Sequence, residues 1–269
     1  MNDATADRTV QEVYESLTDE QKMLVEYLVG EAAALEPRDL AGLIDDEDYE
    51  GIGIADNEGI GAELAAEAEA QTAAMRSELI DLINKLAVVR GKVTLSSGKE
   101  ADYYIDLRRV TLHHRGAPLI GALMFGHLLD LGFVPVGLDD EDALEEGEQM
   151  FSAIGGLTLG ADPIADAVVH AGSMIGAEVD AFVVRKAAKA HGMQRQIEGP
   201  DIAGRNVVIV EDTTTTGGSP IAAIEAVRAA GGYPVAVATI VDRDTGAREK
   251  IEELGVPYYP MFSLSDLTI

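Results

Sequence analysis

Two adjacent carboxylates and a cluster of hydroxyl side chains occur together in residues 207–219, which read VVIVEDTTTTGGS. The β-branched apolar run Val207–Val210 predicts a buried strand with Glu211 and Asp212 at its end. The loop that follows can surround a phosphate with backbone N–H groups and hydroxyls, and a helix beginning at Pro220 would add the positive end of its dipole. Carboxylates can bind vicinal hydroxyls or a hydrated Mg²⁺. A sugar 5-phosphate with free ring hydroxyls offers a phosphate to the loop and vicinal hydroxyls to the carboxylates.

An ordinary strand-to-helix turn in a parallel sheet is the alternative for this segment. It leaves the acidic pair unexplained, because unpaired carboxylates at the end of a buried strand are costly. The segment is not a Walker loop, since no lysine follows Gly217 and Gly218, and it lacks the Gly-x-Gly-x-x-Gly pattern of dinucleotide-binding folds. We therefore interpret it as a loop that binds a phosphate and hydroxyl groups.

A second chemical feature is a cationic segment, residues 185–195, with the sequence RKAAKAHGMQR. Five of its side chains are positive or titratable, in a chain whose formal net charge is −28. Such a concentration of positive charge in an acidic protein indicates an anionic ligand. An exposed basic loop without a ligand is the alternative. Gly192 and Gly199 could serve as hinges for its movement.

These features resemble those of the type I phosphoribosyltransferases, whose loop for phosphoribosyl diphosphate (PRPP) matches residues 207–219. Residues 95–108 (LSSGKEADYYIDLR) resemble the N-terminal hood of the orotate phosphoribosyltransferases. Residues 155–165 (GGLTLGADPIA) resemble the diphosphate-binding loop of the family, with Leu159 where many members have a lysine. The resemblance runs from about Met75 to the C-terminus.

The resemblance implies an enzyme that joins orotate to PRPP, releases diphosphate and forms orotidine 5′-monophosphate, a step of de novo pyrimidine (UMP) biosynthesis. The implied catalytic residues are Lys186, Lys189, His191 and Asp212. The residues implied to bind PRPP are Arg185, Lys186, Lys189, His191, Glu211, Asp212, Thr213, Thr214, Thr215, Thr216, Gly217, Gly218 and Ser219. Those implied to bind orotate are Tyr104, Ile105, Thr215 and Arg243. Mg²⁺ is the implied cofactor, bound mainly through PRPP rather than directly by protein side chains. The implied assembly is a homodimer, in which the cationic loop reaches the site of a neighbouring subunit.

The order of the predicted elements indicates an α/β protein. Helices are expected at 77–86, 112–131, 164–171 and 220–230, and strands at 88–95, 101–108, 150–156, 181–184, 207–210 and 235–241. This alternation predicts a central parallel sheet flanked by helices, with ligands at the carboxyl ends of the strands. With the small N-terminal hood, it would be the type I phosphoribosyltransferase fold. We expect that domain at 75–269 with an acidic, solvated insertion at 132–149. An acidic helical extension would occupy 1–74, with a linker at 36–61.

Composition limits the other classes of function. Cysteine is absent, which excludes a disulfide framework and a thiolate site. No segment has 18 consecutive apolar residues, so we expect a soluble cytoplasmic protein without a membrane span. The negative charge argues against nucleic acid as a partner. The negative charge is concentrated in two segments. Residues 1–75 carry 20 acidic and 3 basic side chains, and residues 139–148 carry 7 acidic and no basic ones.

Three alternatives remain open from the sequence. A phosphoribosyltransferase for a purine or for uracil would share the PRPP loop, but the hood and Arg243 argue against it. A PRPP-binding regulator without turnover would share the fold, yet such proteins typically lose the cationic loop. The N-terminal extension could make the chain part of a larger assembly, or it could aid solubility.

Overall fold

The computed structural model describes residues 57–94, 100–138, 144, 147–186 and 196–269. The chain divides into two compact units, Met1–Met75 and Arg76–Ile269. Helix α3 (Asn57–Leu82) begins in the first unit, in a stretch rich in alanine and glutamate, which are strong helix formers. Its start at Asn57 corrects the expectation of a linker as far as residue 61. None of the described helices is both long and apolar enough to span a membrane.

A six-stranded sheet forms the centre of the Arg76–Ile269 unit, in the order β10-β9-β8-β5-β6-β7. Its strands are β5 (Ala153–Leu157), β6 (Asp180–Val184), β7 (Ile197–Glu198), β8 (Asn206–Thr214), β9 (Tyr233–Asp242) and β10 (Tyr258–Ser263). All neighbours are parallel except β6 and β7, which confirms the predicted parallel sheet and adds one antiparallel edge strand. Val207–Val210 of the central strand β8 have 0% exposure, as expected where helices cover both faces.

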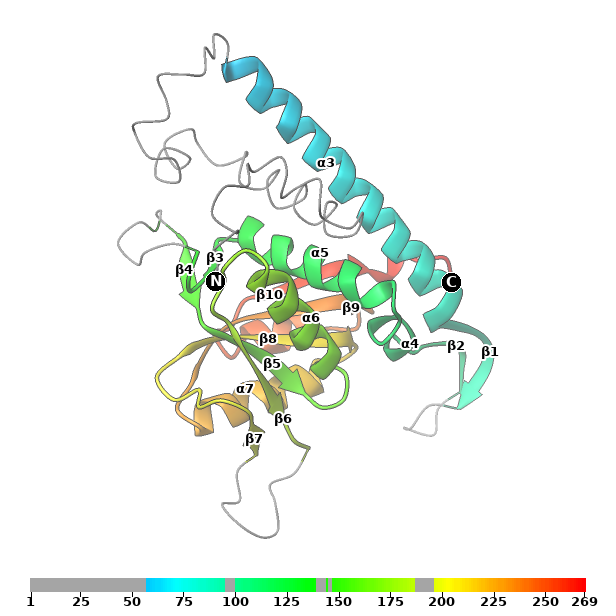
Figure 1. Cartoon of the computed structure of the whole chain (residues 1–269). Helices are drawn as coiled ribbons and strands as arrows, with labels where there is room; N and C mark the ends of the chain where they lie inside the picture. The colour runs from blue at the N-terminus through cyan, green and yellow to red at the C-terminus, as the bar shows by residue number, and fades with distance from the viewer. Residues whose placement is uncertain (1–56, 95–99, 139–143, 145–146, 187–195) are drawn as a thin grey trace, which may run out of the picture. The chain divides into compact units, whose positions relative to one another are not determined.

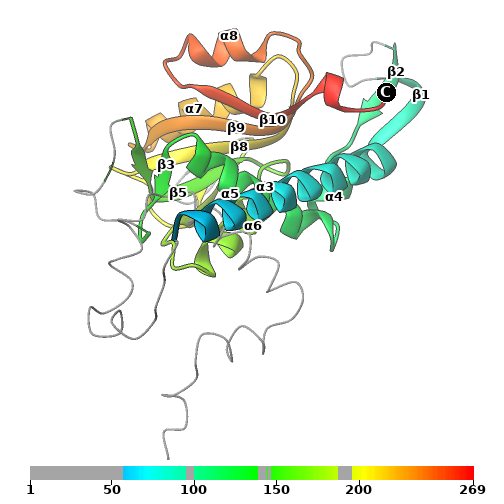
Figure 2. The same cartoon turned by 90° about the horizontal axis from the view of Figure 1, so that it is seen from above.

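Helices cover the two faces of this sheet (Figure 1; Figure 2). Helices α5 (Gly116–Asp130) and α6 (Asp162–Ser173) lie on one face, and α7 (Gly218–Ala229) and α8 (Ala247–Glu252) lie on the other. Residues Ile224 and Val227 of α7 belong to one buried cluster with Val207 and Ile209 of β8. This packing fixes the start of α7 against the end of β8, where the phosphate loop was predicted.

An antiparallel hairpin, which we call the hood, precedes the sheet in the chain. It follows η3 (Ile83–Ala87) and consists of β1 (Val88–Thr94) and β2 (Glu100–Ile105); helix α4 (Arg108–Thr111) comes next. Val88 pairs with Ile105 and both are buried, which confirms the predicted hairpin. The tip of the hairpin lies outside the described residues. Strand β2 ends earlier than predicted because the backbone turns at Asp106, whose carbonyl accepts from Arg109 N at 3.2 Å.

The C-terminal segment contacts the base of the hood. It leaves β10 through the short helix η5 (Leu264–Asp266). The carbonyl of Thr268 accepts a 2.6 Å hydrogen bond from Arg90 Nη2 of β1, and its amide donates to Asn84 Oδ1 of η3 at 2.8 Å. The C-terminal segment therefore joins both the hood and η3.

The predicted acidic insertion at 132–149 contains regular structure. It begins with β3 (Phe133–Pro135), which pairs in parallel with β4 (Gln149–Phe151). All three residues of β3 are buried, so the expectation of a wholly solvated loop was wrong. Most of the acidic residues between β3 and β4 lie outside the described part of the chain.

Two strand boundaries also differ from the predictions. The single strand expected at 150–156 is β4 followed by β5, with Ser152 between them. Strand β8 does not end at the acidic pair but continues to Thr214, and Thr213 and Thr214 pair with Val241 and Asp242 of β9. Threonine is β-branched and favours this extended conformation.

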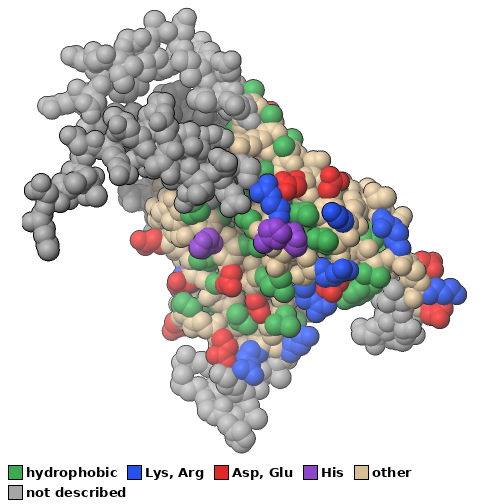
Figure 3. Space-filling view, turned by 45° about the vertical axis from the view of Figure 1, so that its right-hand side comes forward, with side chains coloured by type: hydrophobic (Ala, Val, Ile, Leu, Met, Phe, Trp, Pro, Cys, Tyr) green, Lys and Arg blue, Asp and Glu red, His purple; other side chains and the backbone are tan. Residues whose placement is uncertain are grey.

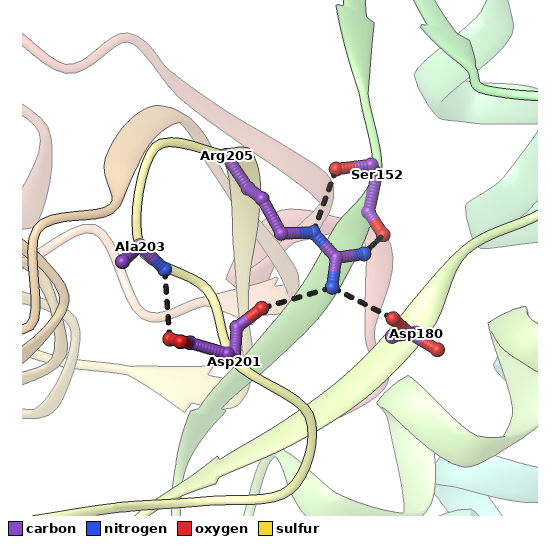
Figure 4. A network of polar contacts seen from close by, with 5 residues as sticks. All are labelled: Ser152, Asp180, Asp201, Ala203 and Arg205. Carbon is purple, nitrogen blue, oxygen red and sulfur yellow. Dashed lines mark hydrogen bonds and ion pairs between the residues drawn. The ribbon is translucent and has the colours of Figure 1, made fainter.

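Arg205, immediately before β8, joins several chain segments at the amino end of the sheet (Figure 4). Its Nε donates to Ser152 Oγ at 2.9 Å, and its Nη2 donates to the Ser152 carbonyl. Its Nη1 donates to Asp180 Oδ2 at 2.7 Å and to the Asp201 carbonyl at 3.1 Å. One guanidinium thus ties together Ser152 before β5, Asp180 at the start of β6 and Asp201 before β8.

We expect Arg205→Met to destabilise the fold, because these carbonyl and carboxylate acceptors lose their shared donor. The Asp180 side chain is 48% exposed, which places the effect at the low end for charge-assisted hydrogen bonds, about 2 kcal/mol. For a domain of this size that is a loss of about 5 °C in Tm. Lys92→Met is the matched control, because its 4.0 Å ion pair joins side chains that are 80% and 72% exposed. Equal Tm values for the two variants would contradict the expectation.

Candidate functional site

The carboxyl ends of β8 and β9 meet at one point of the sheet edge. Thr214 pairs with Asp242, and the amide of Arg243 donates to the Thr214 carbonyl at 3.0 Å. The loop that follows Thr214 and the side chain of Arg243 therefore start from neighbouring backbone positions. In open parallel sheets this edge is where ligands bind. The structure thus brings the two predicted binding elements together.

Glu211 of the acidic pair is buried, whereas Asp212 is half-buried. Glu211 is 6% exposed, and its Oε2 has no hydrogen-bond partner among the described residues. A Cβ built at Gly160, in the loop after β5, would lie 2.6 Å from Glu211 Oε1 and 2.9 Å from Asp212 Oδ1. The approach of this loop requires glycine. A buried carboxylate oxygen with free acceptor capacity suits a ligand hydroxyl.

Burial raises the pKa of the Glu211 carboxyl well above its ordinary value, and the adjacent negative charge of Asp212 raises it further. The positive charge of Lys186 acts in the opposite direction on the same pKa. Without a ligand, Glu211 therefore holds a proton more readily than an exposed glutamate. A ligand that donates hydrogen bonds or brings positive charge would favour the ionised form.

The predicted phosphate loop connects β8 to α7. Gly217 adopts a φ of 78° in the left-handed region, and its carbonyl accepts the Ile221 amide at 3.0 Å, which begins the helix. Thr215, Thr216 and Gly218 are exposed. The loop therefore offers hydroxyls and helix-start N–H groups to solvent, as an anion site requires.

Thr214, also predicted to bind PRPP, turns its side chain into the protein. It is 1% exposed, and its Oγ1 donates to Asp242 Oδ1 at 3.3 Å and also contacts the Tyr258 hydroxyl. Asp242 Oδ1 accepts the Asp244 amide at 3.1 Å as well. Burial raises the pKa of Tyr258 to about 12, so this phenol keeps its proton. The cluster joins β8, β9 and β10 directly beneath the loop.

Two of the predicted cationic residues lie at the end of β6. Arg185 donates its amide to the Gln196 carbonyl at 2.8 Å, and its Nη1 is 3.2 Å from Glu198 Oε1 of β7. Lys186 is exposed. Lys189 and His191, which were predicted to act in catalysis, lie outside the described residues, so their roles stay predictions.

The hood reaches the same region from another part of the chain. The Arg243 guanidinium carbon lies 5.1 Å from the centroid of the Tyr103 ring. Tyr104 is half-buried, whereas the Ile105 side chain is 5% exposed and belongs to the core. A contact of Ile105 with a ligand would therefore come from its backbone. Basic side chains are visible on the face that includes the hood and α4 (Figure 3).

Two residues near this region, Arg108 and Gly160, were not among those predicted. Tyr103 belongs to the Tyr-Tyr-Ile run whose backbone the resemblance implies to contact the base, but the contact of its side chain was not predicted. Arg108 donates to Asp106 Oδ1 at 2.8 Å, which raises the pKa of its guanidinium, and the charge of Asp212 adds to that shift. Both Arg108 and Gly160 belong to sequence runs that resemble family motifs, and this resemblance could have identified them as site residues. Tyr103 gave no separate signal, because its neighbour Tyr104 matched the same run.

The donor set at the site consists of hard oxygen atoms. The carboxylates of Glu211 and Asp212, with the hydroxyls and carbonyls of the loop, are the ligand types that Mg²⁺ prefers. In the described parts of the chain, no three His, Asp or Glu side chains are grouped so that they could hold a metal ion. The chemistry of the residues present is compatible with Mg²⁺ carried by an oxygen-rich ligand.

Comparisons with known proteins agree with this geometry. Residues 155–254 match the phosphoribosyl transferase domain family. An orotate phosphoribosyltransferase of Streptomyces coelicolor is 54% identical over 194 residues, covering 72% of this chain and 97% of that protein. The orotate phosphoribosyltransferase of Mycobacterium tuberculosis in complex with Fe(III) dicitrate aligns with a TM-score of 0.60 at 52% identity, over 72% of this chain and 99% of that one. Its complex with 5-phospho-α-D-ribosyl 1-diphosphate gives a TM-score of 0.57 at 47% identity, over 72% and 99% of the two chains.

We expect Glu211→Gln to stabilise the ligand-free protein more at neutral pH than at acidic pH. A carboxyl group whose pKa is raised by folding stabilises the fold at pH values below its unfolded-state pKa. This stability is lost as the pH rises through the folded-state pKa. Glutamine does not ionise, so the Glu211→Gln variant avoids the loss. The measurement is thermal unfolding at about pH 5.5 and about pH 7.5, where the gain in Tm should grow with pH. Glu225→Gln, at an exposed position on α7, controls for the change in net charge. A gain that is the same at both pH values, or equal in the control, would refute this account.

Proposed function

The chain belongs to the orotate phosphoribosyltransferase family, and we propose that it joins orotate to PRPP, releasing diphosphate and forming orotidine 5′-monophosphate. The observation that carries the proposal is the acidic pair of buried Glu211 and half-buried Asp212, followed by a loop with exposed hydroxyls at the start of α7. One element can thereby hold both the hydroxyls and the 5-phosphate of a pentose.

The ribose end of PRPP would bind at the end of β8. Ribose hydroxyls would donate to Glu211 and Asp212, and the free Oε2 of Glu211 is a ready acceptor. The 5-phosphate would accept hydrogen bonds from the segment Thr213–Ser219 through its amides and its exposed hydroxyls. The negative charge of the acidic pair would also stabilise positive charge that develops on the ribose ring.

The reaction breaks the bond between the anomeric carbon and the diphosphate oxygen, and the diphosphate leaves with the electron pair. A ring nitrogen of orotate then forms the new bond to that carbon. The protein stabilises the charges that develop on both sides of the breaking bond. Arg185, Lys186 and Lys189 would neutralise the departing diphosphate, and His191 would close over it with Lys189.

Mg²⁺ would supply further charge neutralisation on the diphosphate. We propose that PRPP and water provide most of its ligands, because Mg²⁺ is usually bound through substrate phosphates and few carboxylates. We further propose a homodimer in the cytoplasm, in which the loop carrying Lys189 reaches the site of the neighbouring subunit. The catalytic domain would be residues 75–269, consistent with the 97% coverage of the Streptomyces relative by this chain, and residues 1–74 would be an extension.

The choice of orotate over another base rests on Arg243. Its guanidinium lies beside Tyr103 of the hood, and its backbone adjoins Thr214 at the start of the phosphate loop. We propose that the base that attacks the ribose binds there. Orotate differs from uracil by a carboxylate, which is the group that arginine recognises through paired hydrogen bonds. Purines and uracil offer no such anion.

The direct test is to mix the purified protein with PRPP, Mg²⁺ and orotate. We expect the orotate absorbance to fall while diphosphate appears in equal amount. Uracil, adenine and hypoxanthine in place of orotate should release little diphosphate. Turnover with one of those bases and none with orotate would replace the proposal with another phosphoribosyltransferase. Binding of PRPP without turnover of any base would favour a regulator.

We expect Lys189→Ala to lower kcat by about a hundredfold, because one group that stabilises the leaving diphosphate is lost. The KM for PRPP should change by less than about threefold, since the charge it neutralises develops mainly in the transition state. Steady-state kinetics with both substrates measure this split. Lys250→Ala, on the exposed surface of α8, is the control. Equal losses in kcat and in PRPP affinity would mean that Lys189 merely anchors the substrate.

A further inference from the structure

The contact between Tyr103 and Arg243 joins residues from distant parts of the chain. Tyr103 is a half-buried residue of β2 in the hood, and Arg243 directly follows β9. The guanidinium carbon lies 5.1 Å from the ring centroid, within the range of a cation–π interaction. It is a direct side-chain contact between the hood and the carboxyl edge of the sheet.

Arg243 is anchored through its backbone, whereas its side chain makes no hydrogen bond with the described residues. Its amide bonds to the Thr214 carbonyl at 3.0 Å, and the neighbouring Asp242 carboxylate accepts the Asp244 amide at 3.1 Å. Its Nε is buried and finds no hydrogen-bond acceptor within the described part of the protein. An arginine side chain loses considerable rotamer freedom when a ligand fixes it. A contact that holds the tip in advance reduces that loss.

The geometry of a cation–π contact leaves the hydrogen-bonding edge of the guanidinium available. The ring interacts with the face of the planar group, whereas the N–H donors point outward in its plane. A carboxylate binds these in-plane donors in pairs. The Tyr103 ring can therefore hold Arg243 without competing for the donors that a carboxylate needs. Arg90, the cross-strand partner of Tyr103, is engaged elsewhere, with the Thr268 carbonyl at 2.6 Å.

We propose that Tyr103 is a positioning residue for the substrate carboxylate, and that its ring holds the Arg243 guanidinium in the orientation that accepts orotate. This inference rests on the proposed function, in which Arg243 binds the orotate carboxylate. It assigns the role to the aromatic ring of Tyr103 and not to its hydroxyl. Tyr103 thereby makes the hood a determinant of which base the enzyme accepts.

The test compares Tyr103→Phe, which keeps the ring, with Tyr103→Leu, which replaces the ring by an aliphatic side chain. We expect the leucine variant to raise the KM for orotate by about tenfold, the scale of a partly desolvated cation–π contact. The KM for PRPP and kcat should stay within about twofold of wild type. The phenylalanine variant should behave like wild type in all three. Tm values of both variants report on folding, and Tyr103→Met is a second ring-free variant if leucine impairs folding.

A double-mutant cycle with Arg243→Met shows whether Tyr103 acts through the arginine. In that background, Tyr103→Leu should change the KM for orotate no further. The proposal is overturned if the KM for orotate rises as much in the phenylalanine variant as in the leucine variant, or if both variants behave like wild type. It is also overturned if the effects of the Tyr103 and Arg243 substitutions on that KM are additive. It is also overturned if kcat and both KM values worsen together with a lower Tm, which would be a structural role. Absence of turnover of orotate by the wild-type protein would instead refute the proposed function.

Discussion

A carboxyl group buried at the sheet edge is the constraint on which the site depends. Glu211 follows four fully buried apolar residues, and one of its oxygens has no hydrogen-bond partner within the described ranges. Removing a carboxylate from water is unfavourable unless hydrogen bonds or opposite charge compensate. The ligand-free protein compensates in part through the raised pKa of Glu211. The site therefore stores an unfavourable interaction that a ligand rich in hydroxyls can relieve.

The pairing of β8 with β9 places Arg243 next to this local feature. Because Thr214 and Asp242 are partners, the loop that begins at Thr215 and the side chain of Arg243 emerge side by side. The buried contacts of Thr214 with Asp242 and Tyr258 hold that register below the surface. A slip of one residue would turn every side chain of β8 to the opposite face of the sheet. The polar cluster of Thr214, Asp242 and Tyr258 therefore fixes the strand register at the site and also stabilises the fold.

The sequence could predict the parts of this molecule that have local signals. The run Val207–Val210 identified the central strand, and the hood hairpin and the parallel sheet were confirmed. The end of β8 was predicted too early, because the acidic pair was taken as a boundary, although Thr213 and Thr214 favour strand geometry. Strand β3 was missed because its three residues are too short a pattern beside a strongly acidic loop.

The tertiary contacts of the site had no such signal. The ring of Tyr103 and the guanidinium of Arg243 meet because the fold brings β2 of the hood to the end of β9, and no spacing within either segment indicates this. The same holds for Gly160, whose need for glycine comes from the carboxylates of β8 and not from its own loop. Residues Lys189 and His191 were inferred from a motif alone and stay predictions.

The charge of the protein sets a further requirement on the site. Orotate and PRPP are anions, and a chain with a net charge of −28 repels them at long range. Attraction must therefore come from cations close to the site, within about one Debye length, roughly 8 Å at physiological salt. Under the proposed function, Arg108, Lys186 and Arg243 are the candidates, since the charges of Arg108 and Lys186 interact with the acidic pair and the Arg243 backbone adjoins the loop.

Arg185 is engaged with Glu198, but both side chains are 41% exposed, so that pair contributes about 1 kcal/mol or less. Exchanging Glu198 for a diphosphate oxygen would then be favourable, because a diphosphate carries more charge than one carboxylate. The weak ion pair with Glu198 therefore leaves the Arg185 guanidinium available to an anion. This reconciles a strongly acidic protein with a site that must stabilise negative charge.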